Sequence, residues 1–176
     1  MKRLSLFLLL LSLGVAAGRA AENITMTTNG QIGCPGAPPV PSTTTISLAS
    51  WNWGSNDTFS PGAAGGYKLT LSQIALTKQF DACTTAMLGA YFKGAPIKSV
   101  EIDQSKTTNG SAPPVPVAKV VLTNAFLASY GVGGTADSPA TEFWTLSFEK
   151  ICVTTYGQTV TGQSDPGTTV CYGAAG

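Results

Sequence analysis

The chain has 176 residues and a formal net charge of +1; 11% of its residues are charged and none is histidine. The lack of histidine excludes Ser-His-Asp and Cys-His nucleophile systems, and it excludes zinc or haem sites that use histidine ligands. The near-neutral charge gives no electrostatic basis for nucleic-acid binding, and the length predicts one domain with a sizeable core.

Residues 1–20 are predicted to be a secretory signal peptide. They combine a basic start at residues 2–3, an apolar run over 4–13 and small residues over 15–20. The apolar run is shorter than the roughly 20 residues of a membrane span, so no span is expected after cleavage. Cleavage is expected after Ala17 or Ala20. The sequence therefore predicts an exported protein, in the periplasm or outside the cell.

The four cysteines, Cys34, Cys83, Cys152 and Cys171, all follow the signal segment. An even number of cysteines in an oxidising compartment predicts disulfides, and the spacings contain no CxxC pair that would indicate a zinc or redox motif. Four cysteines allow three pairings. We expect Cys34 to pair with Cys83 and Cys152 with Cys171, because the second bond would hold a C-terminal segment to the last long strand.

The first half of the mature chain predicts strands followed by one helix. Its hydrophobic patterns predict strands at 22–29, 43–53 and 67–78, separated by loops at 30–42 and 54–66. The spacing of apolar residues then changes from that of a strand to that of a helix, and a helix ending at Gly94 is predicted. Its inward face is formed by apolar residues at helical spacing: Phe80, Cys83, Met87, Leu88 and Tyr91.

The second half predicts strands alone. They are expected at 97–103, 117–130, 143–156 and 168–172, with a loop at 107–116 and a flexible connection at 131–140. Residues 21–176 are thus predicted to form a single, mainly β domain. A closed or nearly closed barrel is favoured because closure removes unpaired strand edges, and a two-sheet sandwich is the alternative.

Several segments in this order resemble the Hcp family, the tube proteins of bacterial type VI secretion. They are the strand Ile46–Gly54 with its Ser-Trp-Asn-Trp-Gly end, the strand, helix and returning strand over 76–102, and the strands Val120–Tyr130 and Glu142–Ile151. The resemblance implies a β-barrel of two packed antiparallel sheets with one side helix. It also implies hexameric rings that stack into a tube, without catalytic residues or a cofactor.

Three features depart from that family pattern: the signal peptide, the four cysteines, and the long loops at 30–42 and 107–116. We therefore interpret the chain as an exported, disulfide-linked relative, a structural protein that is not an enzyme. The expected partners are further copies of the same chain, which could form hexamers, and secretion-system or cell-surface proteins. No nucleic acid, metal or cofactor is expected.

Two other functions fit parts of the sequence. In the first, a monomeric binding module outside the cytoplasm recognises a glycan or peptide through exposed aromatic residues, Trp51, Trp53 and Trp144. In the second, paired carboxylates hydrolyse a glycosidic bond, which needs no histidine. The acidic residues considered for it are Glu101, Asp103, Glu142 and Glu149.

Overall fold

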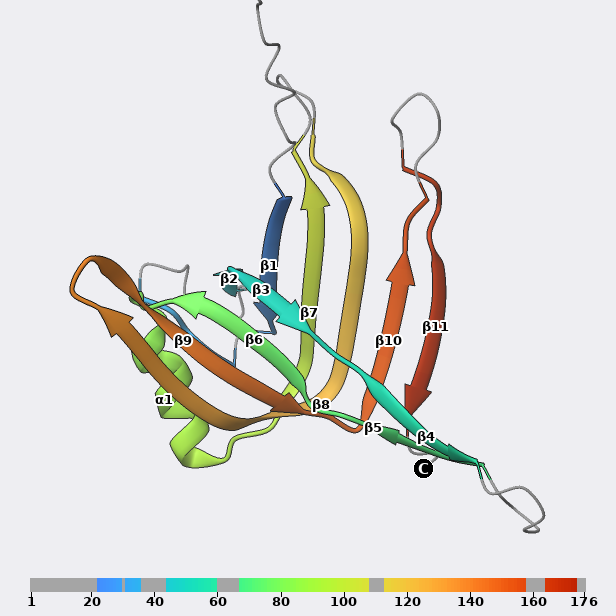
Figure 1. Cartoon of the computed structure of the whole chain (residues 1–176), viewed down its shortest axis with the longest axis horizontal. Helices are drawn as coiled ribbons and strands as arrows, with labels where there is room; N and C mark the ends of the chain where they lie inside the picture. The colour runs from blue at the N-terminus through green and yellow to red at the C-terminus, as the bar shows by residue number, and fades with distance from the viewer. Residues whose placement is uncertain are drawn as a thin grey trace, which may run out of the picture.

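The structure, a computed structural model, describes residues 22–29, 31–35, 44–59, 67–107, 113–157 and 164–173. The predicted signal peptide and parts of the predicted loops at 30–42, 54–66 and 107–116 lie outside these residues. The prediction of a mainly β fold with one helix is confirmed (Figure 1). No helix in the described part of the chain has the length and apolarity needed to cross a membrane.

The described residues form eleven strands and one helix. In chain order they are β1 (Glu22–Thr28), β2 (Thr44–Leu48), β3 (Ser50–Asn52), β4 (Ser55–Phe59), β5 (Tyr67–Leu71), β6 (Ile74–Gln79), α1 (Thr84–Lys93), β7 (Ile97–Lys106), β8 (Val115–Thr135), β9 (Ser138–Ser147), β10 (Lys150–Thr155) and β11 (Thr168–Gly173).

The strands form two antiparallel sheets that share β8. In the first sheet the order is β2-β1-β7-β8-β10-β11, and in the second it is β8-β9-β6-β3. The 21-residue β8 pairs with β7 up to Ala125 and with β9 from Phe126 onward. One strand therefore holds the two sheets together along one side, and the hairpin β4-β5 stands apart from both (Figure 1).

The opposite side is joined by the segment that contains β2 and β3. β2 pairs with β1 and β3 pairs with β6, and the Ala49 amide between them donates to the Thr77 carbonyl at 2.8 Å. The predicted single strand at 43–53 is therefore wrong in one respect. It is interrupted at Ala49, because its two halves belong to different sheets, and this connection closes the barrel.

A corner carries β8 from the first sheet to the second. Asn124 has φ of 49°, a left-handed conformation that asparagine adopts more readily than most residues. Its side-chain amide donates to the Glu149 carboxylate at 2.7 Å, and the Glu149 amide donates to the Thr123 carbonyl at 3.1 Å. The predicted strand at 143–156 turns the same corner and is divided there into β9 and β10.

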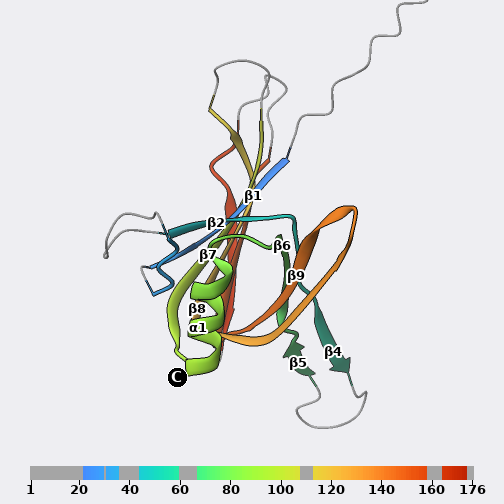
Figure 2. The same cartoon turned by 90° about the vertical axis from the view of Figure 1, so that its left-hand side faces the viewer.

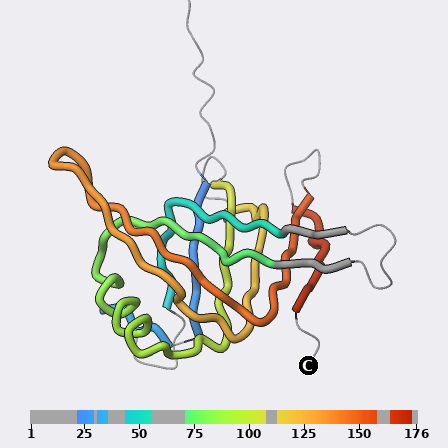
Figure 3. Tube along the Cα trace, turned by 60° about the horizontal axis from the view of Figure 1, so that its bottom comes forward, coloured from blue at the N-terminus to red at the C-terminus, as the bar shows by residue number. Residues whose placement is uncertain are grey.

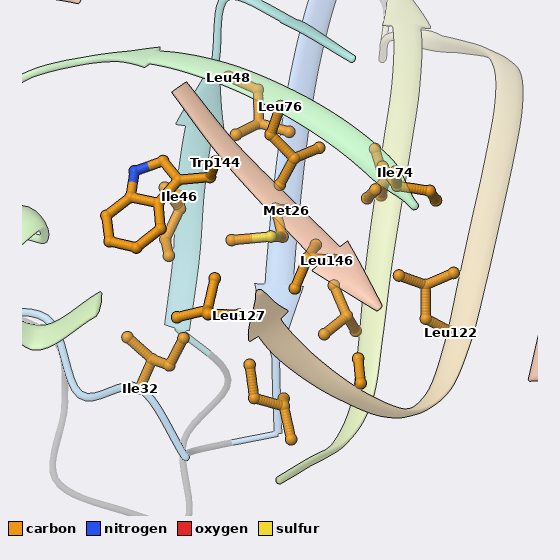
Figure 4. Packing of buried hydrophobic residues seen from close by; sticks show 14 of the residues in the cluster. Met26, Ile32, Ile46, Leu48, Ile74, Leu76, Leu122, Leu127, Trp144 and Leu146 are labelled. Atoms are coloured by element: carbon orange, nitrogen blue, oxygen red, sulfur yellow. The ribbon is translucent and has the colours of Figure 1, made fainter. Parts of the chain in front are cut away.

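The hydrophobic core lies between the sheets and includes Met26, Ile46, Leu122, Trp144 and Leu146 (Figure 4). Figure 2 shows α1 beside the sheets, and its Met87 is buried in the core. The helix ends at Gly94 as predicted, in a left-handed conformation that suits glycine. It starts later than predicted, however, and Phe80 lies before it with 55% of its surface exposed.

Regular hairpins replace two of the predicted loops. The predicted loop at 54–66 contains β4, and the predicted strand at 67–78 is broken after β5, where the Ser72 hydroxyl bonds both the amide and the carbonyl of Gly54. The predicted flexible connection at 131–140 is a hairpin with its turn at Ala136 and Asp137. Pairing across the strands, which local composition does not reveal, places residues 55–59 and most of residues 131–140 in strands.

Both expected disulfides form. Cys34 bonds to Cys83, which ties the segment after β1 to the start of α1, and beside it Ile32 is 1% exposed. Cys152 bonds to Cys171, its direct partner in the register of β10 and β11. The described residues contain no free cysteine.

Candidate assembly surfaces

One end of the molecule carries a projecting hairpin, residues 131–143 of β8 and β9, which we call the arm (Figure 1). Its two strands approach closely, since a β-carbon at Gly134 would lie 3.1 Å from the Ala140 Cα. Phe143 lies opposite Gly131 and is 52% exposed. The arm therefore presents a large apolar side chain on a narrow, glycine-rich ribbon.

The root of the arm contains a buried ion pair. Lys78 of β6 and Glu142 of β9 are direct cross-strand partners, and both side chains are completely buried. The Lys78 ammonium donates to the Glu142 carboxylate at 2.5 Å, to Asp81 at 2.9 Å and to Thr84 at 3.3 Å. This ammonium links the arm, the strand beneath it and the start of α1 at one point.

Aromatic rings pack on one another close to this ion pair. The Tyr130 and Trp144 ring centroids lie 4.4 Å apart, and Tyr91 meets Trp144 edge-on. Partial burial raises the pKa of Tyr130, and the nearby Glu142 charge raises it further. Among the described residues, the second Glu142 carboxylate oxygen and the Trp144 indole nitrogen have no hydrogen-bond partner. The root thus holds a buried lysine that pairs with Glu142 and with Asp81, next to an apolar cluster.

The outer face of the second sheet carries no charged side chain among its described residues. Its outward positions follow from the pairing registers: Ser50, Asn52, Ala75, Thr77, Gln79, Phe126, Ser129, Gly131, Gly133, Thr141, Phe143, Thr145 and Ser147. Phe126 and Phe143 are its exposed large apolar residues. Because the cores of protein interfaces are depleted of charge, this face is suited to contact with protein.

The outer face of the first sheet is charged. The Lys119 ammonium lies 2.7 Å from Glu101 and 3.5 Å from Asp103. Hydrogen bonding to Lys119 lowers the pKa of Glu101, whereas burial raises the pKa of Asp103 and the neighbouring Glu101 raises it further. Glu101 and Asp103, which were considered as a hydrolase pair, form a surface ion network around Lys119.

The remaining acidic candidates also have structural partners. Glu142 bonds to Lys78, and Glu149 accepts a hydrogen bond from Asn124. Cavities of about 280 Å³ and 310 Å³ contain one acidic residue each, Asp81 and Asp165. The described residues also hold no cluster of acidic or cysteine groups that could bind a metal. This geometry does not support a paired-carboxylate hydrolase.

The alternative binding module needs Trp51, Trp53 and Trp144 to be exposed, and none of the three is. Trp144 is 1% exposed and lies in the core. Trp51 and Trp53 are half-buried against the core, and the Trp51 indole donates to Gln104 at 3.1 Å. Their shared parity, noted in the sequence, places them on the inner side of the second sheet, because Trp51 pairs with the buried Leu76.

The other end of the molecule carries β10 and β11, which we call the ribbon (Figures 1 and 3). Val170 is 70% exposed and Tyr172 is 44% exposed. They pair with Val153 and Ile151, so they continue the inner, apolar face of the first sheet beyond the core. The sequence pattern indicates neither the exposed ribbon face nor the burial of Lys78, because both depend on which strands pair in the sheet.

Comparison with known proteins identifies the family of the chain. Residues 41–155 match the family described as type VI secretion system effector, Hcp. No curated protein sequence matches the chain.

Three solved structures show the same fold. One, titled as a type six secretion system protein, has a TM-score of 0.70 at 16% identity and covers 88% of this chain and 96% of its own. Hcp1 of Salmonella typhimurium has a TM-score of 0.64 at 19% identity, with coverages of 87% and 95%. The secreted protein Hcp3 of Pseudomonas aeruginosa has a TM-score of 0.59 at 17% identity, with coverages of 89% and 100%.

Proposed function

The chain belongs to the Hcp family of type VI secretion effectors, and we propose that it is a non-enzymatic structural protein that associates with copies of itself into closed rings. The family match over residues 41–155 carries this proposal. The family resemblance implies hexamers that stack into a tube. The acidic side chains considered for catalysis are engaged in structural contacts, which supports a role through shape and assembly.

The arrangement of the surfaces supports ring formation. A cyclic assembly of more than two copies uses a heterologous interface, in which one surface meets a different surface of the next copy. The arm and the ribbon are different surfaces, and they lie at opposite ends of the molecule (Figures 1 and 3).

The proposal places the protein outside the cytoplasm. Residues 1–20 would direct export and be removed, leaving residues 21–176 as the working domain in the periplasm or outside the cell. Two disulfides support this assignment, because such bonds form and persist in oxidising compartments. Its partners beyond further copies of itself would be secretion-system or cell-surface proteins.

Sedimentation velocity tests the assembly. The oxidised protein, lacking residues 1–20, is expected to sediment at tens of micromolar with a mass six times that of one chain. A single monomeric species at that concentration would contradict the proposal. N-terminal sequencing of the exported protein tests the processing separately, and Ala21 is the expected first residue.

A further inference from the structure

We propose that the Cys152–Cys171 disulfide is a site of reversible thiol–disulfide exchange, and that its reduction releases β11 from the edge of the first sheet. The chemical partner is a dithiol, which reduces this bond in the folded protein while the Cys34–Cys83 bond stays intact. This inference goes beyond the proposed function and does not depend on ring assembly.

The two disulfides differ in how far an attacking thiolate can reach them. Cys171 is exposed and Cys152 is half-buried, and neither is part of the described hydrophobic core. Cys34 belongs to that core with 9% of its surface exposed, and Cys83 packs against it. Exposed disulfides are the labile ones in exported proteins, because exchange requires a thiolate to reach a sulfur atom. The Cys152–Cys171 bond is therefore the accessible one.

The exchange consists of two displacements at sulfur. A thiolate of the dithiol attacks the Cys171 sulfur, which forms a mixed disulfide and expels Cys152 as a thiolate that takes up a proton. The second thiol of the partner then loses its proton and attacks the partner's own sulfur in the mixed disulfide. Cys171 leaves and is protonated, and the partner becomes a disulfide. Two electrons thus pass from the dithiol to the protein, and no further reagent is consumed.

The same displacements are hindered at the Cys34–Cys83 bond from both directions. Attack on the half-buried Cys83 would expel Cys34 as a thiolate into the core, where burial disfavours a charge. Cys83 is the better leaving group, because it lies at the start of α1 and a helix N-terminus stabilises a thiolate. Its departure requires attack on Cys34, however, which is almost completely buried. The fold therefore protects this bond.

Little besides the disulfide holds β11 to the rest of the molecule. It lies at the edge of the first sheet, and β10 is its one partner among the described strands (Figure 1). Five of its six residues are exposed, and the Thr169 and Thr154 hydroxyls share a hydrogen bond of 2.8 Å. A strand with few buried apolar contacts opens locally at a small cost in free energy. We expect β11 to separate from β10 once the covalent bond is broken.

Thiol trapping tests the exchange site. The oxidised protein is treated with limiting dithiothreitol and then with N-ethylmaleimide, and mass spectrometry locates the labelled cysteines. Cys152 and Cys171 should be labelled at least about tenfold faster than Cys34 and Cys83. In urea, where the fold no longer protects Cys34, the two bonds should be reduced at rates within about threefold of each other.

A second reductant distinguishes the two sources of a dithiol. The same order of reduction with reduced thioredoxin would show that a protein dithiol reaches the Cys152–Cys171 bond. Reduction by dithiothreitol alone would restrict the partner to a small dithiol.

Hydrogen exchange tests the release of β11. Selective reduction should accelerate exchange of its protected amides at least about tenfold, and the amides of β7 should stay within about twofold of their rates in the oxidised protein. The variant Cys152→Ser/Cys171→Ser should reproduce this change without any dithiol. The matched variant Cys34→Ser/Cys83→Ser should leave the exchange of β11 unchanged, and thermal unfolding verifies that both variants fold.

The outcomes separate this inference from ring assembly. Equal labelling of the two disulfides in the folded protein, or earlier labelling of Cys34 and Cys83, overturns the exchange site. A preference for Cys152 and Cys171 that persists unchanged in urea also overturns it, because the fold would not be its cause. Selective reduction that leaves β11 protected overturns the release. A monomeric wild type overturns the proposed function and leaves this inference standing.

Discussion

The arm and the ribbon are both two-stranded hairpins that lie at the ends of the molecule, but different forces hold them. The arm has no disulfide, and its root is fixed by the buried Lys78–Glu142 pair and by Trp144. In the ribbon, β11 has little burial on either face, and the Cys152–Cys171 bond joins it to β10.

The difference shows how the chain stabilises a strand pair according to what surrounds it. At the arm root, neighbouring strands and α1 supply enough contacts to bury a charge pair. At the ribbon, β11 is an edge strand with one neighbour, and a covalent bond replaces the missing packing. The arm should therefore be sensitive to charge removal, and the ribbon to reduction.

Removal of the buried ammonium should have the largest effect. Lys78→Met leaves the Glu142 carboxylate buried without its partner, which is expected to cost about 3–5 kcal/mol of unfolding free energy. Urea denaturation measures it. Lys98→Met, at an exposed lysine, is the control and should change stability by less than about 0.5 kcal/mol.

The double variant Lys78→Met/Glu142→Leu should recover most of that loss, because it leaves no unpaired charge in the core. A loss below about 1 kcal/mol for Lys78→Met would show that the ion pair does not hold the arm root.

Removal of either disulfide should give the next largest loss of stability. In the chain-entropy model, Cys34→Ala/Cys83→Ala costs about 4 kcal/mol for its separation of 49 residues, and Cys152→Ala/Cys171→Ala costs about 3 kcal/mol for 19 residues. Unfolding of each variant by urea measures both losses. Equal stability of wild type and the ribbon variant would mean that the ribbon is held by other contacts.

The corner at Asn124 connects the two ends, because β8 passes through it on the way from the first sheet to the arm. Asn124→Ala should cost about 1–2 kcal/mol, since alanine disfavours a left-handed backbone. Asn124→Gly accepts this backbone and should cost less, even though both variants lose the bond to Glu149. Thermal unfolding compares them, and a larger loss for glycine would exclude backbone strain as the cause.

The ion network on the first sheet should give the smallest effect. Lys119 lowers the pKa of Glu101, so this pair stabilises the fold at neutral pH and loses its contribution as the pH falls through that lowered pKa. The pKa of Asp103 is raised, so its ionised form is disfavoured in the folded protein and its contribution has the opposite sign.

Accordingly, Glu101→Gln should reduce stability at pH 7 by at most about 1 kcal/mol, and Asp103→Asn should leave it equal or slightly higher. Unfolding free energies of both variants, measured from acid to neutral pH, test these opposite effects on stability. A loss for Asp103→Asn as large as that for Glu101→Gln would contradict it.

Local sequence patterns predicted the parts of this fold that local chemistry determines. Gly94 ended the helix as expected, the strand near Thr168 was present, and the two cysteine pairs formed. The segments that resemble the Hcp family also predicted the barrel and its side helix.

The missed features depend on residues that are distant in sequence. The break at Ala49 arises because its flanking strands pair with different sheets, and Lys78 meets Glu142 across 64 residues. A single lysine in a strand gives no local sign that it will be buried. The exposed face of Val170 and Tyr172 likewise follows from the position of β11 at the sheet edge, which composition does not show.

Electron microscopy of the oxidised protein without residues 1–20 tests the central claim most directly. The account predicts closed rings of six copies joined head to tail. Isolated single particles, or pairs related by a twofold axis, would contradict it.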